Sequence, residues 1–165
     1  MKNVALLVPI IAFALSACQQ TAEPVDIEAE KEAIMKVIQN ESEFARDGKL
    51  QEFYKLYVQD ESTFYLGVTE NISRYYEGYK EIVANFEFLA ERKDMDYSWV
   101  TISKSNPKFK IYQNTAWVAC ENIWQGKKDT LSVNNEGMQV TFLEKIENDW
   151  KISFIGFLPK LSDEE

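Results

Sequence analysis

Residues 115–124, Thr115 to Trp124 (TAWVACENIW), place small or apolar side chains at alternating positions. A period of two is typical of a β-strand that buries one face. Ala116, Val118 and Cys120 then share a face, so we interpret Cys120 as a small buried hydrophobe. A nucleophilic thiol is disfavoured there because the chain contains no histidine to activate it.

The same period continues on both sides of this stretch. Turn signals at Asn106-Pro107, Gln113-Asn114, residues 134–137 and residues 147–149 separate four further expected strands. These strands are Asp96–Lys104, Lys108–Gln113, Met138–Ile146 and Trp150–Phe157. Consecutive strands with short turns predict an antiparallel meander.

Before Lys93 the apolar period is 3.6, which predicts helices. We expect one from the cap Asp26 to about Arg46, ended by Gly48, and others over residues 49–58 and from Tyr79 to about Arg92. Residues 63–67 read as a strand and residues 71–77 as a loop. In the first helix the expected apolar stripe is Ile27, Ile34, Val37, Ile38, Phe44 and Ala45, and the solvent side is Glu28, Glu30, Lys31, Glu32 and Lys36.

Helices first and strands afterwards indicate an α+β fold, in which a curved sheet buries its apolar face against the helices. A chain of 165 residues, 45% hydrophobic, supports one such core. The net charge of -9 disfavours nucleic acid as a partner. Without histidine, and with only Cys18 and Cys120 as cysteines, we expect no metal centre, no cofactor and no disulfide framework.

The N-terminus has the features of a signal peptide. A positive start at Lys2 precedes an apolar run, Val4 to Leu15, that is too short to span a bilayer as a helix. Its end, Leu15-Ser16-Ala17-Cys18, resembles the lipobox of bacterial lipoproteins, which implies an acylated Cys18 as the mature N-terminus. The alternatives are cleavage after Ala17 without lipid, or a cytosolic segment with a chance cysteine.

These features predict the domain limits and the cellular location. We expect a lipoprotein signal peptide at 1–17, a lipidated Cys18 with a tether at 18–25, a folded domain at 26–158 and an acidic tail at 159–165. The partner implied for Cys18 is the lipid bilayer of a bacterial cell envelope. Gln19, in place of the aspartate that marks inner-membrane retention, favours the outer membrane.

Five short stretches carry a family resemblance: residues 45–50 (ARDGKL), 54–60 (YKLYVQD), 78–82 (GYKEI), 114–118 (NTAWV) and 149–152 (DWKI). Together they resemble the SnoaL-like branch of the nuclear-transport-factor-2-like (NTF2-like) superfamily over about residues 26–158. The resemblance implies a cone-shaped roll of three N-terminal helices in a strongly curved antiparallel sheet, with a pocket at the open end and a homodimer through the outer sheet face. The superfamily includes cyclases, isomerases, dehydratases and noncatalytic domains.

The chain departs from the enzymatic members of that superfamily. No histidine follows Trp150-Lys151-Ile152, and by the resemblance Glu41 stands where steroid isomerases have a tyrosine. Their general-base aspartate falls near Tyr65. Steroid isomerisation by that mechanism is therefore disfavoured.

Glu41 is the most informative candidate because it lies on the apolar stripe, seven residues after Ile34 and three after Ile38. If buried, its carboxyl has a raised pKa and can act as an acid or base or orient a ligand. Otherwise it lies at the edge of the stripe, in solvent or paired with Arg46 or a lysine, which the rarity of buried glutamate favours. The further pocket candidates are Tyr57, Tyr65, Trp99, Asn122 and Glu144, each with core packing or an exposed strand edge as the alternative.

Three functions are consistent with these residues. The favoured one is a noncatalytic, membrane-anchored domain that binds a small apolar or amphipathic ligand, or an envelope partner. The alternative is a cofactor-free isomerase, cyclase or dehydratase that uses carboxylate acid–base chemistry. A structural homodimer with a filled cone is a third reading.

Overall fold

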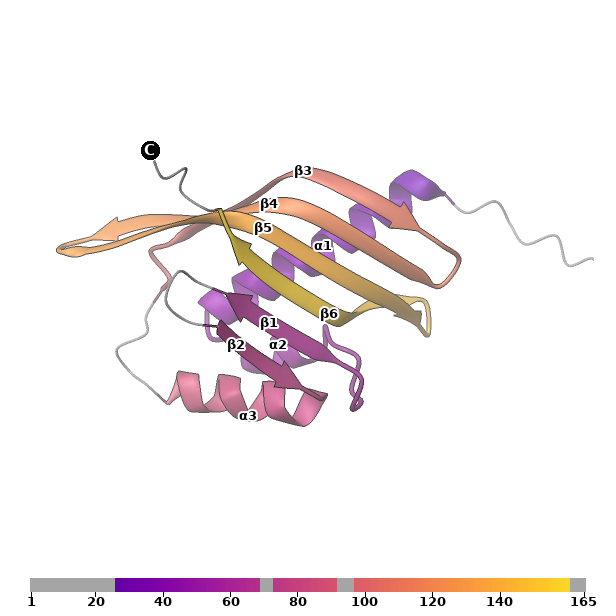
Figure 1. Ribbon diagram of the computed structural model, residues 1–165, viewed down its shortest axis with the longest axis horizontal. Coiled ribbons are helices and arrows are strands. Elements are labelled where there is room, and N and C mark those ends of the chain that lie inside the picture. The colour runs from indigo at the N-terminus through magenta and orange to yellow at the C-terminus, as the bar shows by residue number, and fades with distance from the viewer. Residues whose placement is uncertain (1–25, 69–72, 92–96, 161–165) are drawn as a thin grey trace, which may run out of the picture.

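The computed structural model describes residues 26–68, 73–91 and 97–160, and the predicted signal peptide and Cys18 lie outside them. In this part of the chain three helices and one six-stranded sheet form an α+β fold (Figure 1). The helices are α1 (Ile27–Arg46), α2 (Leu50–Tyr54) and α3 (Tyr79–Ala90). The strands are β1 (Phe64–Val68), β2 (Ser73–Glu77), β3 (Thr101–Ile111), β4 (Thr115–Lys128), β5 (Leu131–Ile146) and β6 (Asp149–Pro159).

The sheet has the order β2-β1-β6-β5-β4-β3, and its curved inner face holds the helices (Figure 1). All neighbouring strands are antiparallel except β1 and β6, which are parallel. The core between sheet and helices includes Ile34, Ile38, Phe53, Ile82 and Ile152, each without exposed surface. The predicted cone of helices inside a curved sheet is therefore confirmed.

Helix α1 begins at the predicted cap. The Asp26 carboxylate accepts hydrogen bonds from the backbone N–H groups of Glu28 and Ala29, both at 3.1 Å. The helix ends before Gly48, whose φ of +67° is a left-handed conformation that glycine adopts readily. Two predicted positions are wrong: Ile27 is 45% exposed rather than part of the stripe, and Glu30 is half-buried against the sheet rather than in solvent.

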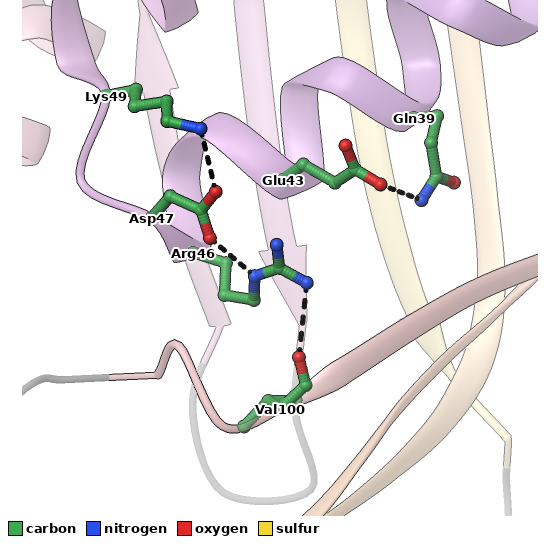
Figure 2. A network of polar contacts seen from close by, with 6 residues as sticks. All are labelled: Gln39, Glu43, Arg46, Asp47, Lys49 and Val100. Atoms are coloured by element: carbon green, nitrogen blue, oxygen red, sulfur yellow. Dashed lines mark hydrogen bonds and ion pairs between the residues drawn. The ribbon is translucent and has the colours of Figure 1, made fainter.

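The end of α1 is held to the start of β3 by a polar network (Figure 2). The Arg46 guanidinium donates to Asp47 at 2.7 Å and to the Val100 carbonyl at 3.3 Å, and Lys49 pairs with Asp47 at 3.0 Å. Arg46 thus contacts Asp47 and Val100, while its predicted alternative partner, Glu41, lies elsewhere.

Two elements near the middle of the chain differ from expectation. Helix α2 covers only residues 50–54 instead of 49–58, because the chain turns there to carry Tyr57 beside Ile152 of β6. Residues 73–77, predicted as a loop, form β2 and pair with β1, with Tyr65 opposite Tyr76. Aromatic cross-strand pairing stabilises this short strand despite its exposed, polar sequence.

Two of the predicted turns lie inside strands. Asn106-Pro107 is a bulge in a continuous β3, where the register with β4 shifts between Ser105 and Lys108 and Asn106 has a φ of +52°. Residues 134–137 belong to β5, and the chain reverses instead at Asp129, whose φ is +53°. The predicted turns at Gln113-Asn114 and at residues 147–149 do lie at strand ends, between β3 and β4 and between β5 and β6.

Strands β4 and β5 extend beyond the rest of the sheet as a two-stranded hairpin arm, residues 126–133 (Figure 1). Pairing of β3 with β4 stops at Gln125, and pairing of β6 with β5 starts at Gly137. At the base of the arm Gly126 leaves room for Trp99, whose ring would lie 2.9 Å from an added Cβ. None of the helices in the described ranges has the length and apolarity needed to cross a membrane.

Candidate interior polar site

Glu41 is buried inside the cone, with 2% of its surface exposed. Helical spacing places it on the face of Ile34 and Ile38, so its carboxyl points into the core instead of reaching the solvent edge. Two hydroxyls donate to it at 3.0 Å, that of Tyr57 to Oε1 and that of Ser42 to Oε2. The carboxyl is therefore buried but fully hydrogen-bonded.

Lys104 extends from β3 to the same place. Its ammonium donates to Ser42 Oγ at 2.8 Å, to Asn122 Oδ1 at 2.9 Å, and to Gln139 Oε1. Asn122 is the cross-strand neighbour of Lys104 on β4, and Gln139 of β5 in turn donates to Thr141 at 3.1 Å. We call this group the interior polar cluster: Glu41, Ser42, Tyr57, Lys104, Asn122, Gln139 and Thr141.

Burial dominates the electrostatics of the cluster. It raises the pKa of the Glu41 carboxyl, opposed by the charge of Lys104 and by the hydrogen bonds from Ser42 and Tyr57. It lowers the pKa of the Lys104 amine, opposed by nearby Glu41. The Tyr57 phenol has a pKa well above its usual range, first from burial and then from the charge of Glu41. Tyr57 is thus a protonated donor at neutral pH.

The structure brings three of the six predicted site residues into this cluster: Glu41, Tyr57 and Asn122. Tyr65 lies beside it within the aromatic core, where burial and the charge of Glu41 raise the pKa of its phenol. The other two residues lie apart from the cluster. Trp99 packs at the base of the hairpin arm, and Glu144 follows buried Leu143 on β5, which turns its side chain to the outer face of the sheet.

Sequence reasoning missed Lys104, Ser42 and Gln139. A lysine at a predicted strand end normally reaches solvent, and the Asn106-Pro107 bulge hid the continuation of β3. Cys120 offered a signal for Gln139. Cys120 was predicted to face inward and is 1% exposed. Its cross-strand neighbour on β5 is Gln139, which therefore faces inward as well. As expected, Cys120 is a buried thiol, and burial raises its pKa.

In the part of the chain that the structure describes, no three His, Cys, Asp or Glu side chains group together as a metal site. The donors of the cluster are hydroxyl, amide, amine and one carboxyl. What they offer chemically is hydrogen bonding and proton transfer between Tyr57, Glu41 and Lys104.

No family model and no curated protein matches the sequence. Solved structures do match. An NTF2-like protein with a cystatin-like fold from Novosphingobium aromaticivorans has 15% identity and a TM-score of 0.65, covering 94% of this chain and 90% of that one. A proposed dehydratase of the NTF2-like family from Streptomyces avermitilis has 11% identity and a TM-score of 0.65, covering 82% and 99%.

The chain has the NTF2-like fold. The association domain of the Caenorhabditis elegans kinase CaMKII shares it as well, with 16% identity, a TM-score of 0.61 and coverage of 79% of this chain and 95% of that one. The NTF2-like fold predicted from the sequence is thereby confirmed. At these identities the likeness concerns the fold, so function rests on the residues of the site.

Proposed function

We propose that this NTF2-like domain binds a small amphipathic molecule inside its cone, with the polar end of the ligand at the interior polar cluster. The observation that carries the proposal is the buried Glu41 carboxyl held by Tyr57 and Ser42. Buried ionisable groups destabilise a fold unless they are fully paired, and such groups concentrate at functional sites. Tyr65 lies near Glu41, and the rings of Phe86 and Phe157 that contact Tyr65 suit the apolar part of the ligand.

The test is native mass spectrometry of the mature protein extracted from its own membrane in mild detergent. A reproducible extra mass on the wild-type protein, reduced in Glu41→Leu, supports the proposal. The Glu144 side chain lies on the outer face of the sheet. If a folded Glu144→Leu variant loses as much of the extra mass as Glu41→Leu does, the assignment of the ligand to the cone is contradicted. Absence of any extra mass under conditions that preserve the fold also contradicts it.

Tyr57 and Glu41 favour one alternative, a cofactor-free acid–base enzyme. Their hydrogen bond of 3.0 Å joins a protonated phenol to a carboxyl of raised pKa, which is the donor and base pair that isomerisation or dehydration requires. Conversion of the bound compound by wild type and not by Glu41→Gln would establish this alternative. Retention of the unchanged compound by both proteins supports binding alone.

We also propose that Cys18 carries acyl chains and anchors the domain to the outer membrane. The support is the sequence Leu15-Ser16-Ala17-Cys18 and the tether that follows it. Cys18→Ser should move the protein from the membrane fraction to the soluble fraction. Unchanged membrane association of that variant would refute the lipid anchor.

Finally, we propose that two copies associate through the outer face of the sheet. A row of aromatic side chains crosses four strands there, which we call the outer aromatic row: Tyr75, Phe64, Phe154 and Phe142. Tyr75 is 64% and Phe142 is 47% exposed, and contiguous exposed aromatics mark association surfaces. The exposed Met138 and Leu158 continue the same apolar face.

A further inference from the structure

Ser42 connects the two ionisable groups of the cluster. Its Oγ lies 2.8 Å from Lys104 Nζ and 3.0 Å from Glu41 Oε2. A hydroxyl has one hydrogen to donate and can accept as well, so it can pass a proton in either direction. Glu41, Ser42 and Lys104 therefore form a continuous proton path inside the cone.

Two protonation states satisfy every hydrogen bond along this path. With a Lys104 ammonium, its three N–H groups donate to Ser42, Asn122 and Gln139, and Ser42 donates to a Glu41 carboxylate. With a neutral amine, the protonated Glu41 donates to Ser42, and Ser42 donates to the lone pair of Lys104. The two remaining N–H groups stay on Asn122 and Gln139. The cluster therefore holds the neutral pair without leaving any member unpaired.

Burial favours the neutral pair, because it disfavours both the carboxylate and the ammonium. Around Lys104, three groups favour the ammonium and so oppose the neutral pair: Glu41 and Glu43 of α1 and the Cys120 thiol of β4. Around Glu41, the Tyr57 hydrogen bond also favours the carboxylate. For both Glu41 and Lys104 burial is the largest of these effects.

We propose that Lys104 is a nucleophilic amine that captures small aldehydes or ketones as an imine, with Ser42 carrying the proton between Lys104 and Glu41. This inference deepens the proposed binding function and rests on it, since the carbonyl compound must enter the cone. It names the ligand class, a carbonyl compound. Lys104 is only half-buried and Asn122 is 8% exposed, so this side of the cluster borders solvent.

The reaction balances without an oxidant or reductant. The lone pair of the neutral Lys104 amine attacks the carbonyl carbon, so the C–N bond forms while the π bond of the carbonyl breaks, and the oxygen takes the Glu41 proton relayed by Ser42 to become the hydroxyl of a carbinolamine. One proton then leaves the nitrogen and returns to Glu41 through Ser42. The nitrogen lone pair next expels the hydroxyl, which takes this proton by the same relay and leaves as water when the C–O bond breaks. A protonated C=N bond remains beside the Glu41 carboxylate. Hydrolysis reverses the sequence and releases the carbonyl compound.

The test treats the intact mature protein with glycolaldehyde and cyanoborohydride between pH 6 and pH 9, and peptide mass spectrometry measures alkylation at each lysine. At pH 7, Lys104 should react at least about tenfold faster than the exposed Lys110 of the same strand, because burial lowers the pKa of the Lys104 amine and leaves more of it unprotonated. Ser42→Ala removes the hydroxyl that carries the proton and should slow the reaction at Lys104. It also removes a hydrogen bond that favours the Glu41 carboxylate and an acceptor for the Lys104 ammonium, so it should move the pH midpoint of the reaction downward. Ser105→Ala, which removes the exposed hydroxyl that donates to Glu121 at 2.7 Å, is the matched control and should change neither.

Equal rates at Lys104 and Lys110 in the wild-type protein at every pH would overturn the proposal, and this comparison needs no variant to fold. An equal response of folded Ser42→Ala and Ser105→Ala would remove the relay. A ligand mass that copurifies with a protein whose Lys104 is unreactive leaves the binding function standing and refutes only the imine. Fast labelling of Lys104 in a protein without any copurified mass would refute the binding function and leave the reactive Lys104 amine standing.

Discussion

The indole Nε1 of Trp150 donates a hydrogen bond of 2.6 Å to Glu30 Oε2, which joins the start of β6 to the first turn of α1. Lys145 of β5 donates to the other oxygen of Glu30 at 2.5 Å and lies 5.5 Å from the centre of the indole ring. Glu30 is thus shared by two strands. This contact fixes the N-terminal end of α1 against the sheet, and α1 carries Glu41 and Ser42.

Replacement of Trp150 should separate the packing contribution from that of the hydrogen bond. Trp150 is 4% exposed, so Trp150→Ala should lower the free energy of unfolding by about 3 to 5 kcal/mol. Trp150→Phe keeps an aromatic ring but leaves Glu30 without one donor, and should cost about 1 to 3 kcal/mol. Urea unfolding followed by circular dichroism measures both. A loss below about 0.5 kcal/mol for Trp150→Ala would show that the ring is not packed in the core.

Glu30 should make the fold weaker in acid. The hydrogen bond from Lys145 is the largest cause that lowers the pKa of this carboxyl below its ordinary value. A lowered pKa in the folded state means stability that is present above the unfolded pKa of about 4.3 and is lost as the pH falls through the folded value. Glu30→Gln should therefore flatten the loss of unfolding free energy below about pH 4.3. If the free energy of unfolding falls with pH at the same slope in wild type and variant in that range, the lowered pKa assigned to Glu30 is contradicted.

Gly137 is a position where the backbone leaves no space for a side chain. A Cβ there would lie 2.1 Å from the carbonyl oxygen of Leu158, on the paired strand β6. Gly137→Ala should destabilise the domain by about 3 kcal/mol or more, because a backbone clash forces β5 and β6 apart. Gly67→Ala in β1 is the matched control: its Cβ would be 3.6 Å from the Tyr65 ring, so a change of at most about 1 kcal/mol is expected. Equal melting temperatures for the two variants would refute the clash.

The fold was predictable where a long periodic pattern began or ended at a residue that caps a helix. The stripe containing Ile34 and Ile38 and the cap at Asp26 gave α1 almost to the residue, because both signals are local. Strand β2 was missed since its five residues are stabilised by pairing with β1, which is a non-local effect. The full length of β5 was missed because Asn134 and Asn135 are typical turn residues, yet they lie in the strand and pair with β4.

The candidate site was predictable only in its apolar frame. Helical spacing placed Glu41 on the buried face, but the frequency of exposed glutamates favoured the wrong alternative. What decides its burial is the set of partners, Tyr57, Ser42 and Lys104, which come from separate elements of the chain. The hydrogen bonds that offset the burial of the Glu41 carboxyl depend on tertiary contacts, so no local pattern in the sequence predicts them.

Charge on the outer aromatic row should prevent self-association. Phe142→Glu puts a carboxylate beside Phe154, whose ring centre lies 5.7 Å from that of Phe142, and a desolvated charge there opposes any contact through this face. Sedimentation equilibrium should then give a monomer for this variant and a dimer for the wild type. Phe88→Glu on α3, where the phenylalanine is 61% exposed, is the control and should stay dimeric. A dimeric Phe142→Glu protein would move the interface elsewhere.

Glu41 should act on stability in the direction opposite to Glu30. Burial raises the pKa of the Glu41 carboxyl in the folded protein above its unfolded value of about 4.3. Its contribution is therefore fully present below about pH 4.3 and is lost as the pH rises through the folded pKa, because ionisation becomes unfavourable in the core. Glu41→Gln keeps the shape and one hydrogen-bond acceptor while it removes the titration.

The free energy of unfolding of Glu41→Gln relative to wild type should consequently increase between about pH 4.3 and neutral pH. Tyr57→Phe removes a donor that favours the carboxylate, so it should raise the Glu41 pKa further and steepen the wild-type dependence on pH. Urea titrations at half-unit steps of pH measure both effects, and NMR of the Glu41 side chain gives its pKa directly. A Glu41 pKa at or below about 4.3 would show that the carboxylate, not the acid, is the stable buried form, and it would remove the proton that Glu41 is proposed to supply through Ser42.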